Sequence, residues 1–217
     1  MKTLIIGGGE VGKALHEVLK EQYYCQTHDP KLGMLALDDF EIMHICIPYS
    51  GTFTEEVKQY QAIYRPKHTV IHSTVPVGTS RLCGATHSPI RGLHPNLALG
   101  IKIFIKFIGG EGASEVADYF RRAGLRIVLF DKSETTEAGK LFDTEYYRAC
   151  IEFTHRVKTF CDKNSLNFHE VYTLFNQTYN EGYAVLGYPE YSRPVLQPIM
   201  TPVGGHCVVP NSKLINE

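Results

Sequence analysis

The chain has 217 residues, of which 43% are hydrophobic and 21% are charged, and its formal net charge is −1. This composition is ordinary for a globular protein with one core, or with one domain and an appendage, and it argues against a disordered chain. Lysines and arginines are scattered among acidic residues, so no basic face indicates binding to nucleic acid or anionic lipid. We therefore expect a small-molecule substrate and no nucleic-acid partner.

The sequence shows neither a membrane anchor nor a secretory signal. No stretch approaches the roughly 18 to 20 consecutive apolar residues that cross a bilayer, and the strand-like LII follows Lys2 and Thr3 directly. These features predict a cytoplasmic protein without a membrane partner. The six cysteines are irregularly spaced, form no CxxC pair and lie in no His/Cys cluster at zinc spacing. We expect no metal site, and five of the cysteines are predicted to be small buried apolar residues.

Along residues 1–131, apolar runs bounded by turn residues alternate with amphipathic stretches. In chain order, the predicted elements are a strand at TLIIGGG, a helix at VGKALHEVLKEQ, strands at YYCQTHD and IMHICIPY, a helix at TEEVKQYQAIY, strands at TVIHST and IFIKFIG, a helix at ASEVADYFRRAG and a strand at LRIVLFD. This alternation is typical of βαβ units. It predicts an α/β fold, with a Rossmann-type, doubly wound parallel sheet and helices on both faces, that ends near Asp131.

Residues 132–217 form the second predicted domain. The stretch Ser133–Lys163 contains no proline and only Gly139 as a breaker, and its apolar residues recur at near-helical spacing, so it predicts one long helix. A shorter helix is predicted at 169–175. From Thr178 onward, the many glycines, prolines and tyrosines favour an ordered irregular tail.

Three glycines follow the first predicted strand and precede an amphipathic helix. Gly7, Gly9 and Gly12 form the pattern GxGxxG, which indicates a dinucleotide site in this strand-turn-helix context. The first glycine permits a tight turn, the second lets the backbone approach a pyrophosphate, and the third allows close helix packing. The helix N-terminus presents unpaired N–H groups to the anion. We predict that this segment, including Glu10 and Val11, binds NAD; a glycine turn that binds nothing is the alternative.

An acidic residue closes the second predicted strand. Asp29 lies about 20 residues after the glycines, where a carboxylate accepts hydrogen bonds from the adenosine ribose and repels a 2′-phosphate. Lys31 softens that repulsion, but no arginine cluster is present, so we expect NAD rather than NADP. Because Pro30 follows, a simple turn residue is the alternative for Asp29. Pro48, at the end of IMHICIPY, is also included among the predicted cofactor-binding residues.

The heptapeptide STVPVGT, residues 73–79, resembles a loop of the UDP-glucose/GDP-mannose dehydrogenase family. Members of that family oxidise the C6 hydroxyl of a nucleotide sugar to a carboxylate with two NAD. By this resemblance, Thr74 lies beside the nicotinamide and positions a reacting water. A strand end followed by a helix cap at Thr79 or Ser80 would explain the residue types, but not the whole heptapeptide.

Two later segments are also similar to this family. TEAGKLFDTEYY is similar to its AE..K....N.F pattern, and the resemblance makes Lys140 the ammonium that steadies a developing alkoxide. An exposed helix lysine is the alternative. The family's asparagine corresponds to Thr144, a candidate substrate residue.

VGGHCVVPN, residues 203–211, is similar to the family's active-site segment, in which the cysteine is the nucleophile. The resemblance makes Cys207 the thiolate that attacks an aldehyde, with a thioester hydrolysed at the end. His206 is an electrostatic neighbour and candidate substrate residue. A buried cysteine after a flexible glycine pair is the alternative.

The chain also departs from the family pattern. The family's aspartate four residues after the cysteine is Asn211 here, which remains a candidate substrate residue. The family's water-activating glutamate corresponds to Ile90 or Asn96, in the competing segments SPIRG and HPNLALG, and neither can act as a general base. His94 can replace it chemically, because an imidazole near neutrality accepts a proton.

By the same resemblance, the chain covers about the first half of a family member and lacks the C-terminal nucleotide-sugar-binding domain, so substrate identity does not carry over. The leading hypothesis is an NAD-dependent oxidoreductase that oxidises a primary alcohol, such as that of a nucleotide sugar, through a Cys-linked intermediate. The alternatives are a β-hydroxyacid or prephenate dehydrogenase-like enzyme, and a catalytically degenerate NAD-binding or scaffold protein. The resemblance implies a homodimer through the long helix, although a monomer covered by its own tail fits the sequence equally well.

Overall fold

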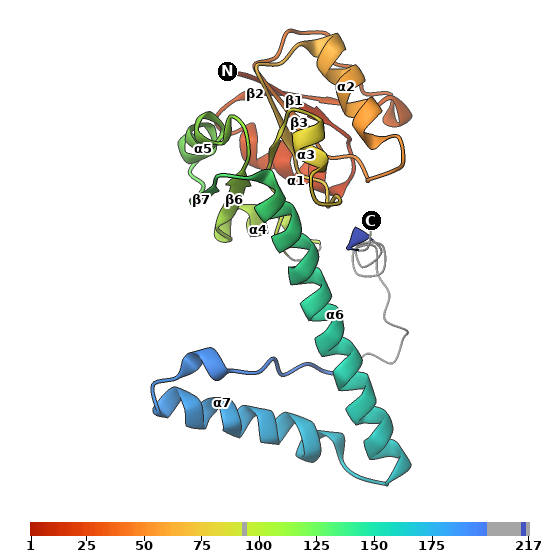
Figure 1. Ribbon diagram of the computed structural model, residues 1–217, viewed down its shortest axis with the longest axis vertical. Helices are drawn as coiled ribbons and strands as arrows, with labels where there is room; N and C mark the ends of the chain where they lie inside the picture. The colour runs from red at the N-terminus through yellow and green to blue at the C-terminus, as the bar shows by residue number, and fades with distance from the viewer. Residues whose placement is uncertain (93–94, 199–213, 216–217) are drawn as a thin grey trace. The chain divides into compact units, whose positions relative to one another are not determined.

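The computed structural model describes residues 1–92, 95–198 and 214–215. The chain divides into two compact units, residues 1–141 and 142–216. Among the described residues, the first unit contains a seven-stranded sheet, and helices fill the connections between its strands (Figure 1). The predicted α/β Rossmann-type fold is confirmed.

The strands of the sheet lie in the order β2-β1-β3-β4-β5-β6-β7. Their bounds are β1 Lys2–Ile6, β2 Tyr24–His28, β3 Ile42–Ile45, β4 His68–Ile71, β5 Thr86–His87, β6 Lys106–Gly109 and β7 Ile127–Phe130. Neighbouring strands are parallel except β5 and β6, which pair antiparallel at His87 and Gly109. The predicted doubly wound parallel sheet therefore contains one antiparallel pair among the described strands.

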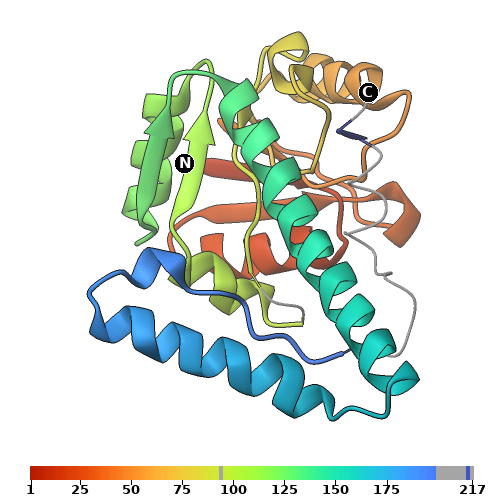
Figure 2. The same ribbon diagram turned by 60° about the horizontal axis from the view of Figure 1, so that its bottom comes forward.

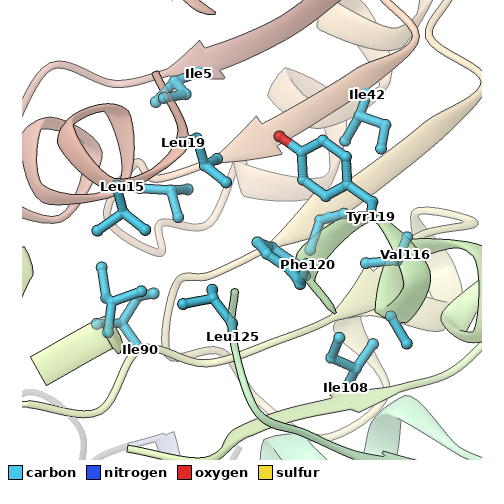
Figure 3. Packing of buried hydrophobic residues seen from close by; sticks show 14 of the residues in the cluster. Ile5, Leu15, Leu19, Ile42, Ile90, Ile108, Val116, Tyr119, Phe120 and Leu125 are labelled. Carbon is cyan, nitrogen blue, oxygen red and sulfur yellow. The ribbon is translucent and has the colours of Figure 1, made fainter. Parts of the chain in front are cut away.

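Helices cover both faces of the sheet. Their bounds are α1 Glu10–Leu19, α2 Phe53–Tyr64, α3 Thr79–Leu82, α4 Leu97–Ile103 and α5 Ala113–Arg122. Because side chains alternate along a strand, Ile5 of β1 faces one apolar cluster while Leu4 and Ile6 face another. The first cluster contains residues of α1, α4 and α5, and the second contains residues of α2. Figure 3 shows Tyr119 and Phe120 of α5 in the first cluster, near Ile42 of β3.

The segment before β6 differs from the prediction. The apolar run IFIKFIG was predicted as a strand, but α4 continues to Ile103 and β6 begins only at Lys106. Leu97 and Ile101 are both buried and lie four residues apart, so one face of α4 packs on the core at helical spacing. The strand that remains, β6, lies beside β7 (Figure 2).

From Ser133 onward, the residues that the structure describes are largely helical. Helix α6 spans Ser133–Lys163, as predicted from its lack of proline. A π-helical turn at His169–Leu174 leads directly into α7, Phe175–Val185. The prediction of an irregular tail from Thr178 was therefore wrong up to Val185, because Gly182 is tolerated within the helix. The next proline begins a short 3-10 turn at Pro189–Tyr191. Among the described residues, no helix is both long and apolar enough to cross a bilayer.

Candidate cofactor site and neighbouring polar cluster

Two of the three fingerprint glycines are required by the backbone itself. Gly7 has a φ of +98°, and a Cβ placed on it would lie 2.8 Å from the carbonyl oxygen of Cys46. A Cβ on Gly12 would lie 1.9 Å from the carbonyl oxygen of Gly7. Both contacts are far inside van der Waals range, so the turn between β1 and α1 forms only with glycine at these two positions.

Gly9 is different, because the fold itself does not demand a glycine there. Its φ of −69° is accessible to any residue, and a Cβ placed on it would meet no atom within 4 Å. Gly9 is the N-cap of α1, and Glu10 and Val11 follow in the first turn, where backbone N–H groups lack acceptors within the helix. The partial positive charge of a helix N-terminus and an unobstructed glycine fit a phosphate.

Asp29 contacts the glycine turn and is also a turn residue of its own loop. Its Oδ2 accepts a hydrogen bond from Gly8 N at 2.8 Å, which ties the end of β2 to the glycine turn. Its Oδ1 accepts from Lys31 N at 3.1 Å and caps the 3-10 turn Pro30–Leu32, so Asp29 is a turn residue as well. A carboxylate has about four acceptor positions, so both oxygens can accept further hydrogen bonds from a ribose.

A groove of about 690 Å³ opens beside the glycine turn, within the size range of small-molecule sites. Polar side chains of α1 and residues of β2 form one part of it, and apolar side chains of the loop after β2 form the other. The lining residues are Gly8, Lys13, His16, Glu17, Lys20, Cys25, Gln26, Thr27, Met34, Leu35 and Leu37. The groove therefore offers both apolar and polar contacts next to the turn.

The ends of β3 and β4 lie beside the glycine turn in the sheet order. The chain leaves β1 toward β2 on one side and β3 lies on the other, which is the topological switch point where α/β sheets bind ligands. Pro48 is exposed in the loop after β3, and Thr74 is half-buried in the loop after β4. The two loops are joined directly, because Ser73 Oγ donates to Ile47 O at 2.5 Å.

A buried histidine that the sequence analysis did not single out lies next to Thr74. His87 ends β5, with its Nε2 3.2 Å from Ser73 O and its Nδ1 2.8 Å from Thr136 Oγ1. The pKa of His87 is lowered to about 3, mainly by burial and in part by the positive charges of Lys106 and Lys140, although the hydrogen bond to Ser73 acts in the opposite direction. His87 is therefore neutral, and Lys140 is close enough to affect its charge.

Glu137 was also missed by the sequence analysis. Its side chain is fully buried, and its two oxygens accept hydrogen bonds from Gly78 N at 2.6 Å and Ser80 N at 2.7 Å. Lys140 follows three residues later on α6 and is half-buried. The AE..K pattern that pointed to Lys140 also contains this glutamate, so the signal was present in the sequence.

Thr144 is half-buried on α6 in the second unit. His94, His206, Cys207 and Asn211 lie outside the described residues.

The two positions that compete for the family glutamate are both described. Ile90 is buried in the apolar core, and Asn96 is exposed at the N-cap of α4. Neither contributes an acid to the ends of β4 and β5.

The five other cysteines are buried or half-buried. Burial raises the pKa of Cys25 to about 11 and that of Cys46 to about 12, so neither thiol ionises readily at neutral pH.

No protein-family model matches the chain, and no curated protein matches it. Solved structures do. A UDP-D-ManNAc dehydrogenase from Pyrococcus horikoshii is similar with a TM-score of 0.73 and 17% identity, over 99% of this chain and 64% of that one. A 3-hydroxyisobutyrate dehydrogenase from Mycobacterium tuberculosis has a TM-score of 0.62 and 13% identity, over 89% and 76% of the two chains. A reductive aminase from Aspergillus terreus, in complex with NADPH and ethyl levulinate, has a TM-score of 0.57 and 14% identity, over 86% and 74%.

These likenesses show that the chain has a fold shared by nucleotide-sugar dehydrogenases and other oxidoreductases. The chain spans 64% of the length of the Pyrococcus enzyme. The three similar proteins differ in substrate class, so the fold alone does not select a substrate.

Proposed function

We propose that this protein binds NAD and transfers a hydride to it from an alcohol. The observation that carries the proposal is Gly9, an unobstructed glycine at a helix N-terminus between two glycines that the backbone requires. Gly7, Gly9 and the first turn of α1 would hold the pyrophosphate, and Asp29 would accept from the ribose hydroxyls. When bound, the cofactor supplies a hydride acceptor at C4 of its nicotinamide ring.

The polar cluster at the ends of β4 and β5 supplies the rest of the chemistry. The carbon of the alcohol would give a hydride to the cofactor while its hydroxyl proton passes to water, and negative charge develops on the oxygen as that proton leaves. The Lys140 ammonium stabilises this charge, and a preorganised cation in a site of low polarity is effective at doing so. The Thr74 hydroxyl, at the end of β4, orients the substrate oxygen or a water.

For a primary alcohol we propose a second oxidation. The Cys207 thiolate adds to the aldehyde carbon, and the resulting thiohemiacetal gives a hydride to a second NAD to leave a thioester. Water then hydrolyses the thioester to a carboxylate and the free thiol. Ile90 has a hydrocarbon side chain that is buried in the core, so it provides no base for this hydrolysis. We propose that His94 acts as the base instead.

A single oxidation, like that of a hydroxyacid dehydrogenase, is the second candidate. It is favoured by the similarity to the 3-hydroxyisobutyrate dehydrogenase, of which the aligned region covers 76%. This reaction needs Lys140 but not Cys207. Full turnover by Cys207→Ser would therefore select it over the two-step oxidation.

We further propose that the chain forms a homodimer through α6. This helix carries exposed apolar side chains along its length, namely Phe142, Tyr146, Phe153 and Phe160. Exposed apolar residues at such density indicate a protein interface. Light scattering on the purified protein tests the proposal, and a monomer at micromolar concentration would overturn it.

The binding proposal is tested by calorimetric titration of NAD and NADP into the wild type and Gly9→Val. Gly182→Val is the matched control, because a Cβ on Gly182 also meets no atom within 4 Å, and it lies on α7. We expect NAD to bind the wild type and Gly182→Val alike, and Gly9→Val to fold normally without binding. NADP should bind more weakly than NAD, because Asp29 repels its 2′-phosphate.

A panel of nucleotide sugars and hydroxyacids is then titrated into the NAD complex. A nucleotide sugar that binds supports the two-step oxidation, whereas a hydroxyacid supports the single oxidation. If neither NAD nor NADP binds the wild type, the protein is a non-catalytic relative that keeps the fold only.

A further inference from the structure

Glu137 is a buried carboxylate whose hydrogen bonds all go to the main chain of one loop. The loop runs from the end of β4 to α3, residues 72–78, and continues into the first turn of that helix. Glu137 Oε2 accepts from Gly78 N and Oε1 from Ser80 N, at 2.6 and 2.7 Å. Removing a carboxylate from water costs several kcal/mol unless hydrogen bonds replace the lost hydration. The side chain therefore has to stay bound to these two N–H groups.

The loop is held against α6 at both of its ends. Glu137 holds its far end. At its near end, His87 lies between Ser73 O and Thr136 Oγ1, so it links the residue before Thr74 to α6. Beside these two anchors, Arg81 Nε donates to Glu134 Oε1 at 2.7 Å, and an exposed ion pair of this kind adds little to holding the loop. The first turns of α6 are thus fixed to both ends of the segment that contains Thr74.

Lys140 lies on the same face of α6 as these anchors. It follows Thr136 by four residues and Glu137 by three, and residues at these spacings are neighbours on one helix face. A rotation or shift of the first turns of α6 would therefore move Lys140 away from the loop that carries Thr74. We propose that Glu137 is a positioning residue that fixes Lys140 with respect to Thr74. This inference rests on the proposed function of those two residues.

We assign Glu137 a positioning role and no proton transfer, because its side chain is fully buried and backbone N–H groups of the loop hold both of its oxygens. Its loss should act on the geometry at the reacting oxygen and leave the cofactor site intact, since the glycine turn and Asp29 lie at the ends of β1 and β2. The expected signature is a lower kcat with an unchanged NAD affinity. Displacements of about 1 Å at a reacting centre cost on the order of 100-fold in rate.

The experiment compares Glu137→Gln with Glu134→Gln as the matched control. Both changes replace a glutamate on the first two turns of α6 that contacts the α3 region, but Glu134 is partly exposed and makes a surface ion pair of little energetic weight. Glu137→Gln keeps the shape of the side chain and one acceptor, while its amide NH2 faces a backbone donor.

Four quantities are measured on the full chain: the NAD dissociation constant, kcat and KM, the exchange rates of the Gly78 and Ser80 amides, and the pH profile of Lys140 labelling by an amine reagent. We expect Glu137→Gln to lower kcat by about 10- to 100-fold, to keep NAD affinity within about twofold, and to change both amide exchange and Lys140 labelling. Glu134→Gln should match the wild type in all four within about twofold.

A folded Glu137→Gln with wild-type amide exchange and Lys140 labelling overturns the proposal. If Glu137→Gln does not fold, Glu137→Asp, which is one methylene shorter, is measured in the same way. Failure of both variants to fold would make Glu137 a requirement for folding and would also overturn the positioning role. Amide exchange and labelling do not depend on turnover, so they decide the role of Glu137 even if the wild type oxidises no substrate and the proposed function fails.

Discussion

At the scale of single residues, the three glycines after β1 have separate physical reasons to be glycine. Gly7 and Gly12 are packed against backbone atoms, and Gly9 is packed against nothing. The sequence pattern predicted all three by their spacing, and the structure shows that the fold requires two of them. The role of Gly9 in binding a pyrophosphate stays a prediction until the titration is done.

The packing of Gly12 gives a stability prediction. Gly12→Ala places a methyl group 1.9 Å from Gly7 O, so α1 must move away from β1 or the turn must distort. Overpacking of this kind should lower the free energy of unfolding by about 2 kcal/mol or more. Gly9→Ala is the control and should stay within about 0.5 kcal/mol of the wild type. Urea unfolding followed by circular dichroism measures both, and equal stability of the two variants would contradict the packing argument.

At the scale of elements, the sequence predicted long and regular segments well and short apolar ones poorly. The bounds of α6 follow from the absence of proline between Ser133 and Lys163. By contrast, the run from Leu97 to Gly109 is apolar except for Lys102 and Lys106, and a mainly apolar run of this kind does not distinguish helix from strand. The sequence analysis missed the hydrogen bonds of Glu137, because its partners Ser80 and Gly78 lie 57 and 59 residues away in the chain.

At the same scale, Tyr172 connects separate elements of the second unit. It is buried, and its ring stacks on Phe168 with centroids 5.1 Å apart. Its hydroxyl donates to Pro194 O at 3.1 Å and accepts from Leu196 N at 3.4 Å, so it attaches the segment after the last 3-10 turn to the helices.

Tyr172→Phe removes these two bonds and a third, in which Thr154 Oγ1 donates to the Tyr172 hydroxyl at 3.2 Å, but keeps the ring. We expect a loss of about 1 kcal/mol in the free energy of unfolding, because a buried acceptor and donor lose their partner. Hydrogen exchange at Leu196 should become faster. Tyr191→Phe is the control, because Tyr191 is 55% exposed and should tolerate the change. A Leu196 amide that exchanges at the wild-type rate would contradict the assignment.

At the scale of the whole molecule, a chain of polar groups crosses the core of the first unit. His72 Nδ1 lies 2.6 Å from Ser88 O, and a carbonyl only accepts, so this nitrogen carries the proton. His72 Nε2 then accepts from His44 Nδ1 at 2.9 Å. His44 Nε2 in turn accepts from the Tyr119 hydroxyl, which accepts from Thr3 Oγ1. Each hydrogen bond in this series is donated in the same direction, from Thr3 toward Ser88. This arrangement requires both histidines to be neutral.

Lys106 lies at the end of this chain, buried, with its Nζ 3.2 Å from Ser88 O. Burial lowers the pKa of His44 to about 3 and that of His72 well below its usual value, in both cases with a further contribution from Lys106. Burial also lowers the pKa of Lys106 to about 7. The unfolded chain therefore binds more protons than the folded one, through the histidines below about pH 6.5 and through Lys106 between about pH 7 and 10.

Stability should consequently rise with pH from 5 to 8.5. The histidine contribution is fully present above about pH 6.5 and is lost as the pH falls, and the cost of a buried charged lysine is relieved as the pH rises above about 7. One proton of difference corresponds to about 1.4 kcal/mol per pH unit. The range ends at 8.5 because the raised pKa values of Cys25 and Cys46 act in the opposite direction at higher pH.

Urea midpoints measured by circular dichroism at several pH values test this, since the chain has no tryptophan for fluorescence. Lys106→Met should be more stable than the wild type at pH 7 and should lose the rise above that pH. A wild type whose stability is flat from pH 5 to 8.5 would contradict neutral histidines in the core. No sequence pattern predicted this network, because its members come from five segments and are hidden within apolar strands and helices.

The glycine turn also bears on how this sequence can diverge. A side chain on Gly7 would meet the carbonyl of Cys46 and one on Gly12 the carbonyl of Gly7, so a descendant that lost its ligand would still keep both glycines in order to fold. No backbone contact requires a glycine at position 9. We therefore expect mutations to replace Gly9 first, with the serine or aspartate that suit a helix N-cap better. Within this fingerprint, the second glycine is therefore the position whose substitution in related chains would mark the loss of dinucleotide binding, while the outer two would report only ancestry.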